Sequence, residues 1–486
     1  MLATAYRRAW GSLAVGLAAG LSLAPLAPQT ARGFTADGGP GVPVPKPVSR
    51  QCPPGMACGI IRTAHRLFNR ADPSHYCNYD TAWRPSDPFV RFIVLHDTET
   101  SYDRTVELPA NPKYCASWHY LVRSDDGHVD QALDVRNIAW HAGNRWFNTH
   151  SIGIEQEGWA SRGTRWFTDE MYRSTARLVR YLAHKYDIPL DRGHILGHDN
   201  VPADTGKGVA KMHTDPGPYW DWDYFMRLVG APLTSEDDSS GDGSSADVVM
   251  IRPDFQDNRL VFSGCVPASE PVDGGACGTA PARPSSVVML HTAPYDDAPL
   301  IGDPYLHAGR AAGTDKYGDW SAEAATGEKF VLAGREGDWA AIWFGGRKAW
   351  LRSDALIPAR GEYVTPKRGR ASIPVYGRPI PEPGELPGPI ASWARRAGRV
   401  PVPYDKYTIR AGQKYVLIDT FRSGIYYAAS YDGSAPGDRT TYTGAKAYHL
   451  IYFNHRYAFV DAAQVKVVRD RCSEPESCVP GDRFIG

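Results

Sequence analysis

The chain has 486 residues, which is too long for one hydrophobic core and predicts about two to four domains. Its 54 basic and 54 acidic residues balance, so no broad basic field indicates nucleic-acid binding and no acidic excess indicates a disordered chain. Hydrophobic residues make up 42% and charged residues 22%, which is an ordinary globular composition.

Residues 1–36 have the composition of a signal peptide. Arg7 and Arg8 precede an apolar run from Leu13 to Leu23, and small residues and prolines follow it. The run is shorter than the ~20 apolar residues of a membrane-spanning helix, so we expect cleavage, with an uncleaved anchor as the alternative. The arginine pair also fits a twin-arginine export signal. The mature protein would then be secreted or cell-wall associated, without an integral membrane segment.

Eight cysteines follow the signal and a Pro/Gly-rich leader at residues 37–50. An even number in an exported protein favours disulfides, although on the order of a hundred pairings are possible. No CxxC spacing supports the alternative of a cysteine-bound zinc. The spacing suggests Cys52 with Cys58, Cys265 with Cys277, Cys472 with Cys478 and, on either side of His96, Cys77 with Cys115.

Residues 51–233 combine the periodicities of strands and helices. Short apolar runs at 92–95, 119–122 and 151–154 predict buried strands. The segment 168–186 predicts an amphipathic helix capped by Thr168, with acidic residues in its first turn and basic residues in its last. This part of the chain is therefore expected to be an α/β domain.

The segment 234–247 reads as a flexible linker, because it is rich in Ser, Asp and Gly and has no large apolar residue. Beyond it, short strand patterns alternate with turns, and no amphipathic helix stands out. A weak repeat contains GEKFVL at 327–332 and GQKYVL at 412–417. The pattern resembles bacterial SH3-like domains and predicts two small, mainly β units at 248–365 and 366–486.

Three histidines of the first half lie at predicted strand ends or in a loop, positions from which side chains can bind a metal ion. His96 ends one predicted strand, His198 follows another, and His213 and Asp215 share a proline-rich loop. Two imidazoles and a carboxylate can bind zinc and leave a position for water. Spacing alone does not establish this site, since the chain has no HExxH motif.

Six ordered segments resemble the type-2 N-acetylmuramoyl-L-alanine amidase family. This resemblance covers about residues 91–223 and implies a mixed sheet flanked by helices, a zinc cofactor and peptidoglycan as the substrate. The segments are FIVLHDTE (92–99), SWHYLVRSDDG (117–127), IAWHAGN (138–144), SIGIEQEG (151–158), LGHDNVP (196–202) and HTDPGPYWDW (213–222).

The resemblance implies a role for each residue of the candidate site. His96, His198 and Asp215 match the zinc ligands, and Glu155 matches the acid that takes a proton from the attacking water. Glu157 is the alternative base, because it lies on the same face of a strand as Glu155.

Three further positions are assigned less directly. His213 occupies the place of a lysine that stabilises the oxyanion, although it could replace His198 as a ligand. His141 and Trp118 are expected to line the substrate groove; the alternative for His141 is a buried structural histidine. Trp118 stands where phage relatives have a tyrosine, and an indole cannot accept a proton.

We therefore expect a secreted zinc amidase that cuts the bond between N-acetylmuramic acid and L-alanine in peptidoglycan. The alternative is a non-catalytic peptidoglycan receptor on the same fold; cytoplasmic muropeptide recycling is disfavoured by the signal peptide. The second half is expected to bind the wall and to anchor the catalytic half through the linker. Four of its aromatic residues could stack on sugars or fill small β cores, namely Trp320, Trp343, Tyr426 and Tyr427.

Overall fold

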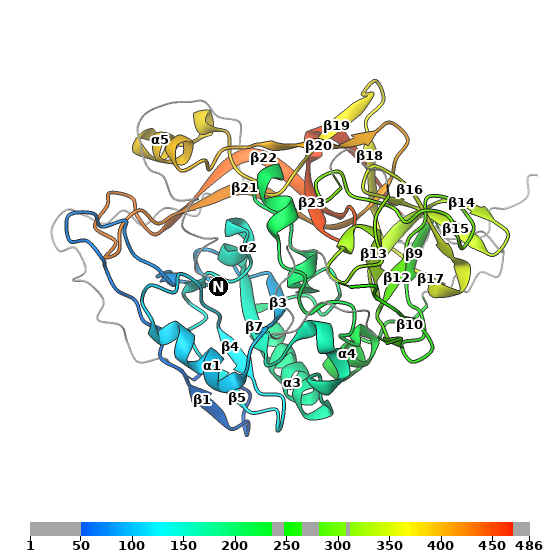
Figure 1. Ribbon diagram of the computed structural model, residues 1–486. Helices are drawn as coiled ribbons and strands as arrows, with labels where there is room; N and C mark the ends of the chain where they lie inside the picture. Colours follow the sequence, from blue (N-terminus) through cyan, green and yellow to red (C-terminus); the bar gives the residue numbers. More distant parts are fainter. Residues whose placement is uncertain (1–49, 236–246, 265–280, 308–311, 470–486) are drawn as a thin grey trace, which may run out of the picture.

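The computed structural model describes residues 50–235, 247–264, 281–307 and 312–469 (Figure 1). The predicted signal peptide, the leader up to residue 49 and linker residues 236–246 lie outside the described residues. So do the cysteines at 265, 277, 472 and 478. Within the described part, no helix combines the length and the apolar character that a membrane crossing requires.

The first half is built on a six-stranded mixed sheet, as the α/β prediction requires. Strands β4, β7, β3 and β8 run parallel to one another, and β5 pairs antiparallel to β4. In spatial order the strands are β1 (Cys58–Ile60), β5 (Val129–Gln131), β4 (Tyr120–Val122), β7 (Ser151–Gln156), β3 (Phe92–Asp97) and β8 (Ile195–Gly197). A separate pair joins β2 (Tyr79–Asp80) to β6 (Ile138–Ala139).

Helices lie on both sides of this sheet, with α2 on one side and α3 and α4 on the other (Figure 1). The predicted long helix is α3, which starts after Thr168; the Thr168 hydroxyl accepts a hydrogen bond from the Met171 amide and caps it. The α-helices of this half are α1 (Tyr102–Glu107), α2 (Arg145–His150), α3 (Asp169–Tyr186) and α4 (Trp222–Val229). The short 3₁₀ turns are η3 (Leu108–Ala110), η4 (Ala160–Arg165), η5 (His198–Asn200) and η6 (Gly206–Lys211).

Two of the suggested disulfides lie in described segments, and both are present. Cys52 is bonded to Cys58, and Cys77 is bonded to Cys115. The first closes the N-terminal edge of the sheet beside β1, and the second ties the loop before β2 to the loop before β4. The cysteine spacing therefore predicted these two pairs correctly.

The second half is mainly β, and its two units repeat one strand order. The first unit has the order β16-β15-β14-β9-β17, and the second contains β23-β22-β21-β18-β24. In each, a 3₁₀ turn precedes the last strand. The first unit consists of β9 (Val248–Ile251), β14 (Lys329–Glu336), β15 (Trp339–Phe344), β16 (Arg347–Arg352), η8 (Ser353–Ala355) and β17 (Leu356–Pro358). The second consists of β18 (Tyr363–Pro366), β21 (Tyr415–Tyr427), β22 (Thr440–Tyr452), β23 (Tyr457–Asp461), η10 (Ala462–Gln464) and β24 (Val465–Val468).

The remaining elements are insertions around these two sheets. The second unit extends its sheet with β19 (Ser372–Tyr376) and β20 (Pro403–Arg410). It also carries η9 (Pro383–Glu385) and a helix that the sequence did not suggest, α5 (Gly388–Arg396), which is short and flanked by prolines. The first unit adds β10 (Arg259–Leu260), β11 (Arg283–Pro284), β12 (Val287–Met289), η7 (Trp320–Ala322) and β13 (Glu323–Ala325).

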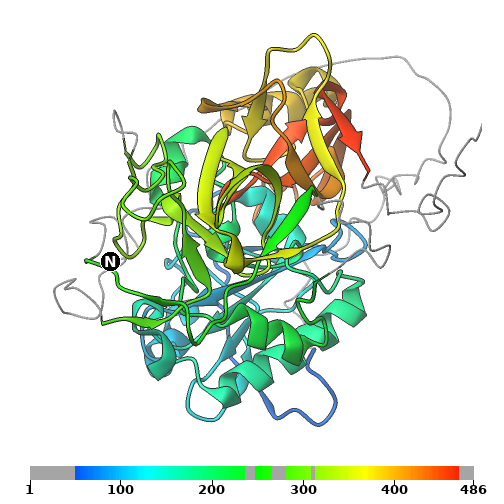
Figure 2. The same cartoon turned by 90° about the vertical axis from the view of Figure 1, so that its right-hand side faces the viewer.

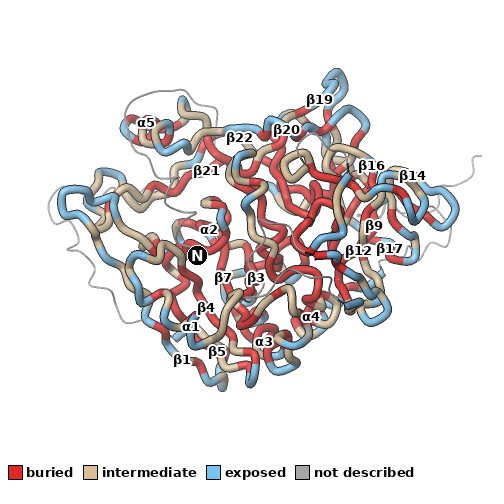
Figure 3. The backbone as a smooth tube through the Cα atoms, viewed as in Figure 1, coloured by how far each residue is buried: buried red, intermediate tan, exposed pale blue. Residues whose placement is uncertain are grey.

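The two halves pack closely against each other, which differs from the loosely anchored arrangement that the linker suggested. The second β unit, orange to red, lies directly on the catalytic half, blue to cyan (Figure 2). Trp146 of α2 contacts Phe421 and Phe459, with ring centroids 4.8 and 5.1 Å apart. A single hydrophobic core joins both halves, and buried segments lie on both sides of the contact (Figure 3).

Three of the four aromatic residues that could stack on sugars or fill β cores are buried. Trp320, Tyr426 and Tyr427 are each 6% exposed or less, and Trp343 is half-buried. Buried rings of this kind contribute to the cores of the β units and their contact with the catalytic half. For the three buried residues, the prediction that they fill β cores is therefore confirmed.

Candidate metal centre and active site

Three side chains meet at the carboxyl edge of the parallel strands. His96 lies near the end of β3, His198 directly follows β8, and Asp215 approaches from the loop before α4. His96 Nδ1 lies 3.1 Å from His198 Nδ1, and Asp215 lies 3.1 Å from His198 and 3.2 Å from His96. All three are at most 6% exposed. The predicted ligands are thus brought together by the ends of neighbouring parallel strands.

This arrangement fits a zinc ion. Zinc bound tetrahedrally at ~2.0–2.1 Å keeps neighbouring ligand atoms about 3.3 Å apart, close to the distances found here. Two imidazole Nδ1 lone pairs at 3.1 Å repel each other unless a proton or a cation lies between them. Although burial acts to raise it, His198 and His96 hold the pKa of Asp215 well below its usual value, so a carboxylate faces the two rings.

His141 was predicted to line the substrate groove, but it is buried and hydrogen-bonds to the ligand His96 on the side away from the other ligands. Its Nδ1 lies 2.8 Å from His96 Nε2, and its Nε2 lies 3.1 Å from Ser151 Oγ. The Ser151 hydroxyl donates in turn to the Phe147 carbonyl at 2.5 Å. If His96 Nε2 donates to His141, every bond in this chain has a donor and an acceptor, and His96 Nδ1 keeps its lone pair for a metal.

Gly153 makes room for this support. A Cβ atom at Gly153 of β7 would stand 2.7 Å from the His141 ring, which is closer than carbon atoms can approach. The ring of His141 therefore lies flat against the sheet only because β7 has a glycine there. This explains why a glycine precedes Ile154 and Glu155 in the SIGIE segment.

Replacing His141 by alanine is expected to weaken metal binding about 10–100-fold, because a ligand that loses its outer partner loses orientation. Burial, followed by the positive field of His96, lowers the pKa of His141 well below its usual value, so no charge is lost in the change. The measurement is competition with a chromogenic chelator. His150→Ala is the matched control, since the ring of His150, at the end of α2, is also buried but, among the described residues, bonds to the Phe89 carbonyl and to no metal ligand. Equal zinc affinity in the two variants would contradict the assignment.

Glu155 faces the ligands, whereas Glu157 is used structurally. Glu155 of β7 pairs in register with His96 of β3, so both side chains project from the same face of the sheet. Burial and the nearby Asp215 raise the pKa of Glu155 well above its usual value. Glu157 accepts the Tyr102 amide at 2.8 Å and the Ser124 amide at 2.9 Å, one on each carboxylate oxygen. The geometry therefore favours Glu155 as the base over its alternative.

His213 lies beside the ligands but outside their cluster. Its ring stacks on His198 with centroids 5.0 Å apart, and its Nδ1 is 3.9 Å from Asp215. The side chain is 33% exposed, whereas the three ligands are buried. His198 rather than His213 completes the described ligand cluster, which argues against the exchange of ligands considered above.

Trp118 is not placed in a substrate groove. It is 4% exposed and packs with Ile61, Leu121 and Ala132 in a small hydrophobic cluster. The expectation that Trp118 contacts substrate therefore has no support in this packing, because a position in a family motif does not show in which direction the side chain points.

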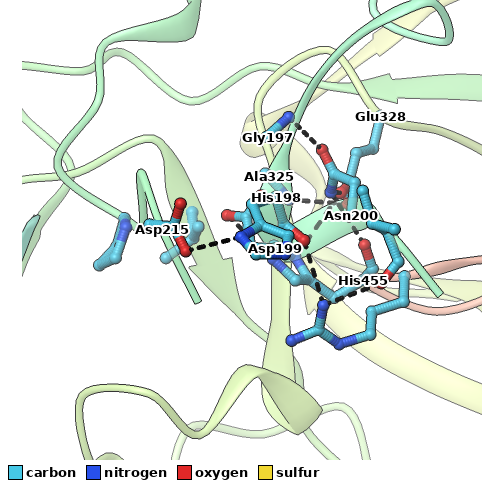
Figure 4. Close-up of polar contacts among 12 residues, drawn as sticks. Gly197, His198, Asp199, Asn200, Asp215, Ala325, Glu328 and His455 are labelled. Atoms are coloured by element: carbon cyan, nitrogen blue, oxygen red, sulfur yellow. Dashed lines mark hydrogen bonds and ion pairs between the residues drawn. The ribbon is translucent and has the colours of Figure 1, made fainter. Parts of the chain in front are cut away.

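A buried polar network behind His198 was not foreseen from the sequence. The Asn200 amide donates to Glu328 at 2.8 Å and to the His455 carbonyl at 2.9 Å, and His455 lies 3.3 Å from Asp199 (Figure 4). Asp199 and Asn200 belong to the catalytic half, Glu328 to the first β unit and His455 to the second. The network therefore joins all three parts directly behind a metal ligand.

Arg456 extends this network to the loops that carry the site. Its guanidinium donates to the carbonyls of His198 at 3.3 Å, Val201 at 3.0 Å and His213 at 2.7 Å, and it stacks over Trp320 at 4.7 Å. The loop with His198 and the loop with His213 are thus held by one residue of the second β unit. Nothing in the local sequence around Arg456 indicates this contact, because it depends on docking between distant segments.

Replacing Glu323 by glutamine is expected to stabilise the protein more at pH 8 than at pH 5. Glu323 of β13 is 5% exposed, and burial raises its pKa to about 8. The folded protein therefore keeps a proton that the unfolded chain releases near pH 4.5, so this group's contribution to stability falls between about pH 4.5 and pH 8. Thermal unfolding across this range measures the effect. A variant whose advantage does not grow with pH would contradict the assignment.

Comparison with known proteins places these residues in a family. A family model described as N-acetylmuramoyl-L-alanine amidase matches residues 85–218. N-acetylmuramoyl-L-alanine amidase A of Achromobacter lyticus is 28% identical over 170 residues, which is 32% of this chain and 91% of that protein. The 1,6-anhydro-N-acetylmuramyl-L-alanine amidase AmpD of Salmonella typhimurium is 30% identical over 170 residues, which is 30% of this chain and 84% of that protein.

Among solved structures, the complex of the E. coli N-acetylmuramyl-L-alanine amidase AmiD with its substrate is 20% identical, with a TM-score of 0.26. The match covers 35% of this chain and 69% of that one. The family segment at 85–218 contains all four residues of the site, namely His96, Glu155, His198 and Asp215. On the identity to the Salmonella protein over most of its length, the chain belongs to the type-2 N-acetylmuramoyl-L-alanine amidase family.

Proposed function

We propose that this protein is a secreted, zinc-dependent N-acetylmuramoyl-L-alanine amidase that hydrolyses the amide between N-acetylmuramic acid and L-alanine in peptidoglycan. The observation that carries the proposal is the buried cluster of His96, His198 and Asp215 with Glu155 paired beside His96. The amidase names of the relatives support the reaction and the substrate class. The predicted signal peptide is what supports export to the wall.

Zinc held by the two imidazoles and the carboxylate would polarise the scissile carbonyl and lower the pKa of a water molecule at the site. The protein's own contribution starts with Glu155. As a carboxylate it takes a proton from the attacking water, and it then gives that proton to the amide nitrogen of alanine as this nitrogen leaves. No covalent intermediate with the protein is required.

His213 is proposed to stabilise the oxyanion. Its ring stacks on His198 and is partly exposed beside the ligand cluster. An imidazole N–H can donate to the developing negative charge, and a protonated ring adds an electrostatic contribution. His213 stands where other relatives have a lysine, and it still provides a hydrogen-bond donor at this position.

The alternative of a non-catalytic receptor has less support. A receptor needs neither the metal ligands nor the catalytic acid, and this chain has both. The ligand cluster is complete, and Glu155 lies beside it.

For the second half, we propose two SH3-like units. The shared strand order and the 3₁₀ turn before each last strand support this assignment. Binding of the wall by these units stays a prediction.

The test of the proposed reaction is product analysis on a defined muropeptide. The protein is expected to release a peptide with a free N-terminal alanine and a muramic acid with a free lactyl carboxyl group. Mass spectrometry distinguishes these products from those of glycosidases and endopeptidases. Recovery of intact muropeptide, or cleavage at a peptide or glycosidic bond, would contradict the proposal.

A further inference from the structure

A cavity of about 320 Å³ lies between the catalytic half and the second β unit. One wall is formed by β6 and α2, and the other by β21 and the segment around α5. This volume falls at the lower end of the range for small-molecule pockets. Its apolar lining includes Ile138, Trp140, Trp146, Ile380 and Ile425.

Three arginines line this cavity, together with two aspartates that are already engaged. Asp204 pairs with Arg378 at 2.9 Å, and Asp80 accepts the Trp140 indole N–H at 3.0 Å and the Tyr76 hydroxyl at 2.7 Å. The lining histidine, His150, is neutral, because burial lowers its pKa to about 3. The lining therefore carries one more positive than negative charge.

Two of the arginines have buried donors without a partner among the described residues. These are the Nε atoms of Arg378, which is 5% exposed, and of Arg399. Arg399 stacks over Trp393 at 4.1 Å, and its Nη1 reaches the Tyr426 carbonyl only at 3.4 Å. Burial, followed by the positive charge of Arg145, lowers the pKa of Arg399 well below its usual value. Such a group is stabilised by an anion.

The cavity comes near the metal site at Gly143, although its lining includes none of the three ligands. Gly143 is exposed and belongs to the lining, and a Cβ atom there would stand 3.3 Å from the Met212 thioether and 3.8 Å from His198 Nε2, the ring nitrogen that does not face the other ligands. A substrate whose scissile amide lies at the ligands would pass Met212 and Gly143 to place one of its ends in the cavity. Because Arg378, Arg399 and Tyr426 belong to the second β unit, this part of the site exists only with both halves present.

We propose that this cavity binds a carboxylate of the stem peptide, with Arg399 as its principal donor. The argument rests on the proposed function and on the charge of the substrate. The lactyl carboxyl of muramic acid is consumed in the scissile amide, and the N-acetylated sugars are neutral. The anionic groups of the substrate therefore lie on its peptide side, so a positively charged cavity beside the metal site selects that side.

The test is a binding measurement that needs no hydrolysis. Calorimetry compares the stem peptide L-alanyl-γ-D-glutamyl-diamino acid, with free carboxylates, against the same peptide with its carboxylates amidated. The full-length protein is expected to bind the carboxylate peptide at least about tenfold more tightly, as charge-assisted hydrogen bonds allow. Arg399→Met should abolish this difference, and Arg399→Lys should keep part of it. Arg395→Met, which alters an exposed arginine of α5 outside the cavity, should leave the difference unchanged.

Unchanged thermal unfolding and zinc content would show that the Arg399 variants are folded. Equal affinity of the unmodified protein for the two peptides, or a full difference in Arg399→Met, would overturn the proposal. Glycerol phosphate serves as the competing probe: if it binds while amidation of the peptide has no effect, the cavity takes wall phosphates and the stem-peptide assignment is wrong. A protein that binds the carboxylate peptide selectively but cleaves no muropeptide would refute the proposed function and leave this inference standing.

Discussion

Replacing Glu155 by glutamine is expected to lower kcat by about 10²–10⁴-fold, the usual contribution of a general base. The amide is nearly isosteric but cannot take the proton of the attacking water. Because Glu155 stands beside His96 without being part of the ligand cluster, zinc content should stay near that of the unmodified protein. The measurements are single-turnover hydrolysis of a muropeptide and metal analysis of the same sample.

Glu157→Gln is the matched control for this prediction. Both carboxylate oxygens of Glu157 accept backbone amides, so a glutamine would place its NH₂ group against one of these donors. The expected result is a lower melting temperature with hydrolysis largely retained below it. If Glu157→Gln were inactive and Glu155→Gln active, the base would be misassigned by two residues.

Deleting residues 248–486 is expected to abolish both stable folding and activity, even on soluble muropeptides. The deletion would expose Phe92 and Trp146, which now contact Phe421 and Phe459, and burying such a ring contributes about 1.5–3 kcal/mol. It would also remove Arg456 and leave the carbonyls of His198, Val201 and His213 without this donor. Losses of this size are large against the ~5–15 kcal/mol stability of a typical domain. Circular dichroism and zinc binding of the shortened protein measure the effect.

The single change Arg456→Ala tests the role of Arg456 separately from the other effects of deleting the second half. We expect a folded protein with weaker zinc binding and lower kcat, because the loops of His198 and His213 lose their common anchor. Added guanidinium should restore part of the activity by filling the vacated place. Arg252→Ala is the control, since Arg252 also joins the two halves, through Asp223 at 3.0 Å, but does not touch these loops. A fully active shortened protein would contradict both predictions.

The ligands could be predicted because each lies where a strand ends. The apolar run before His96 and the one before His198 fix two parallel strands, whose carboxyl ends meet at one edge. The limits of α3 followed from Thr168 and the charges of its end turns. These features are local, so the sequence pattern carries them.

What the sequence did not predict depends on contacts between distant segments. Glu155 and Glu157 are equivalent by alternation, and only the bonds of Glu157 to Tyr102 and Ser124 distinguish them. The role of His141 depends on the space above Gly153. A polar linker between two parts likewise does not show whether those parts dock, and here Arg456 joins residues about 250 positions away.

Stoichiometric reconstitution with zinc tests the central claim most directly. Metal-free protein, prepared with a chelator, should remain folded because the core does not depend on the site. Its hydrolysis of a muropeptide should rise linearly with added zinc, stop at one equivalent per chain, and stay absent in His198→Ala. Full activity of the metal-free protein, or restoration of His198→Ala by one equivalent of zinc, would contradict the account.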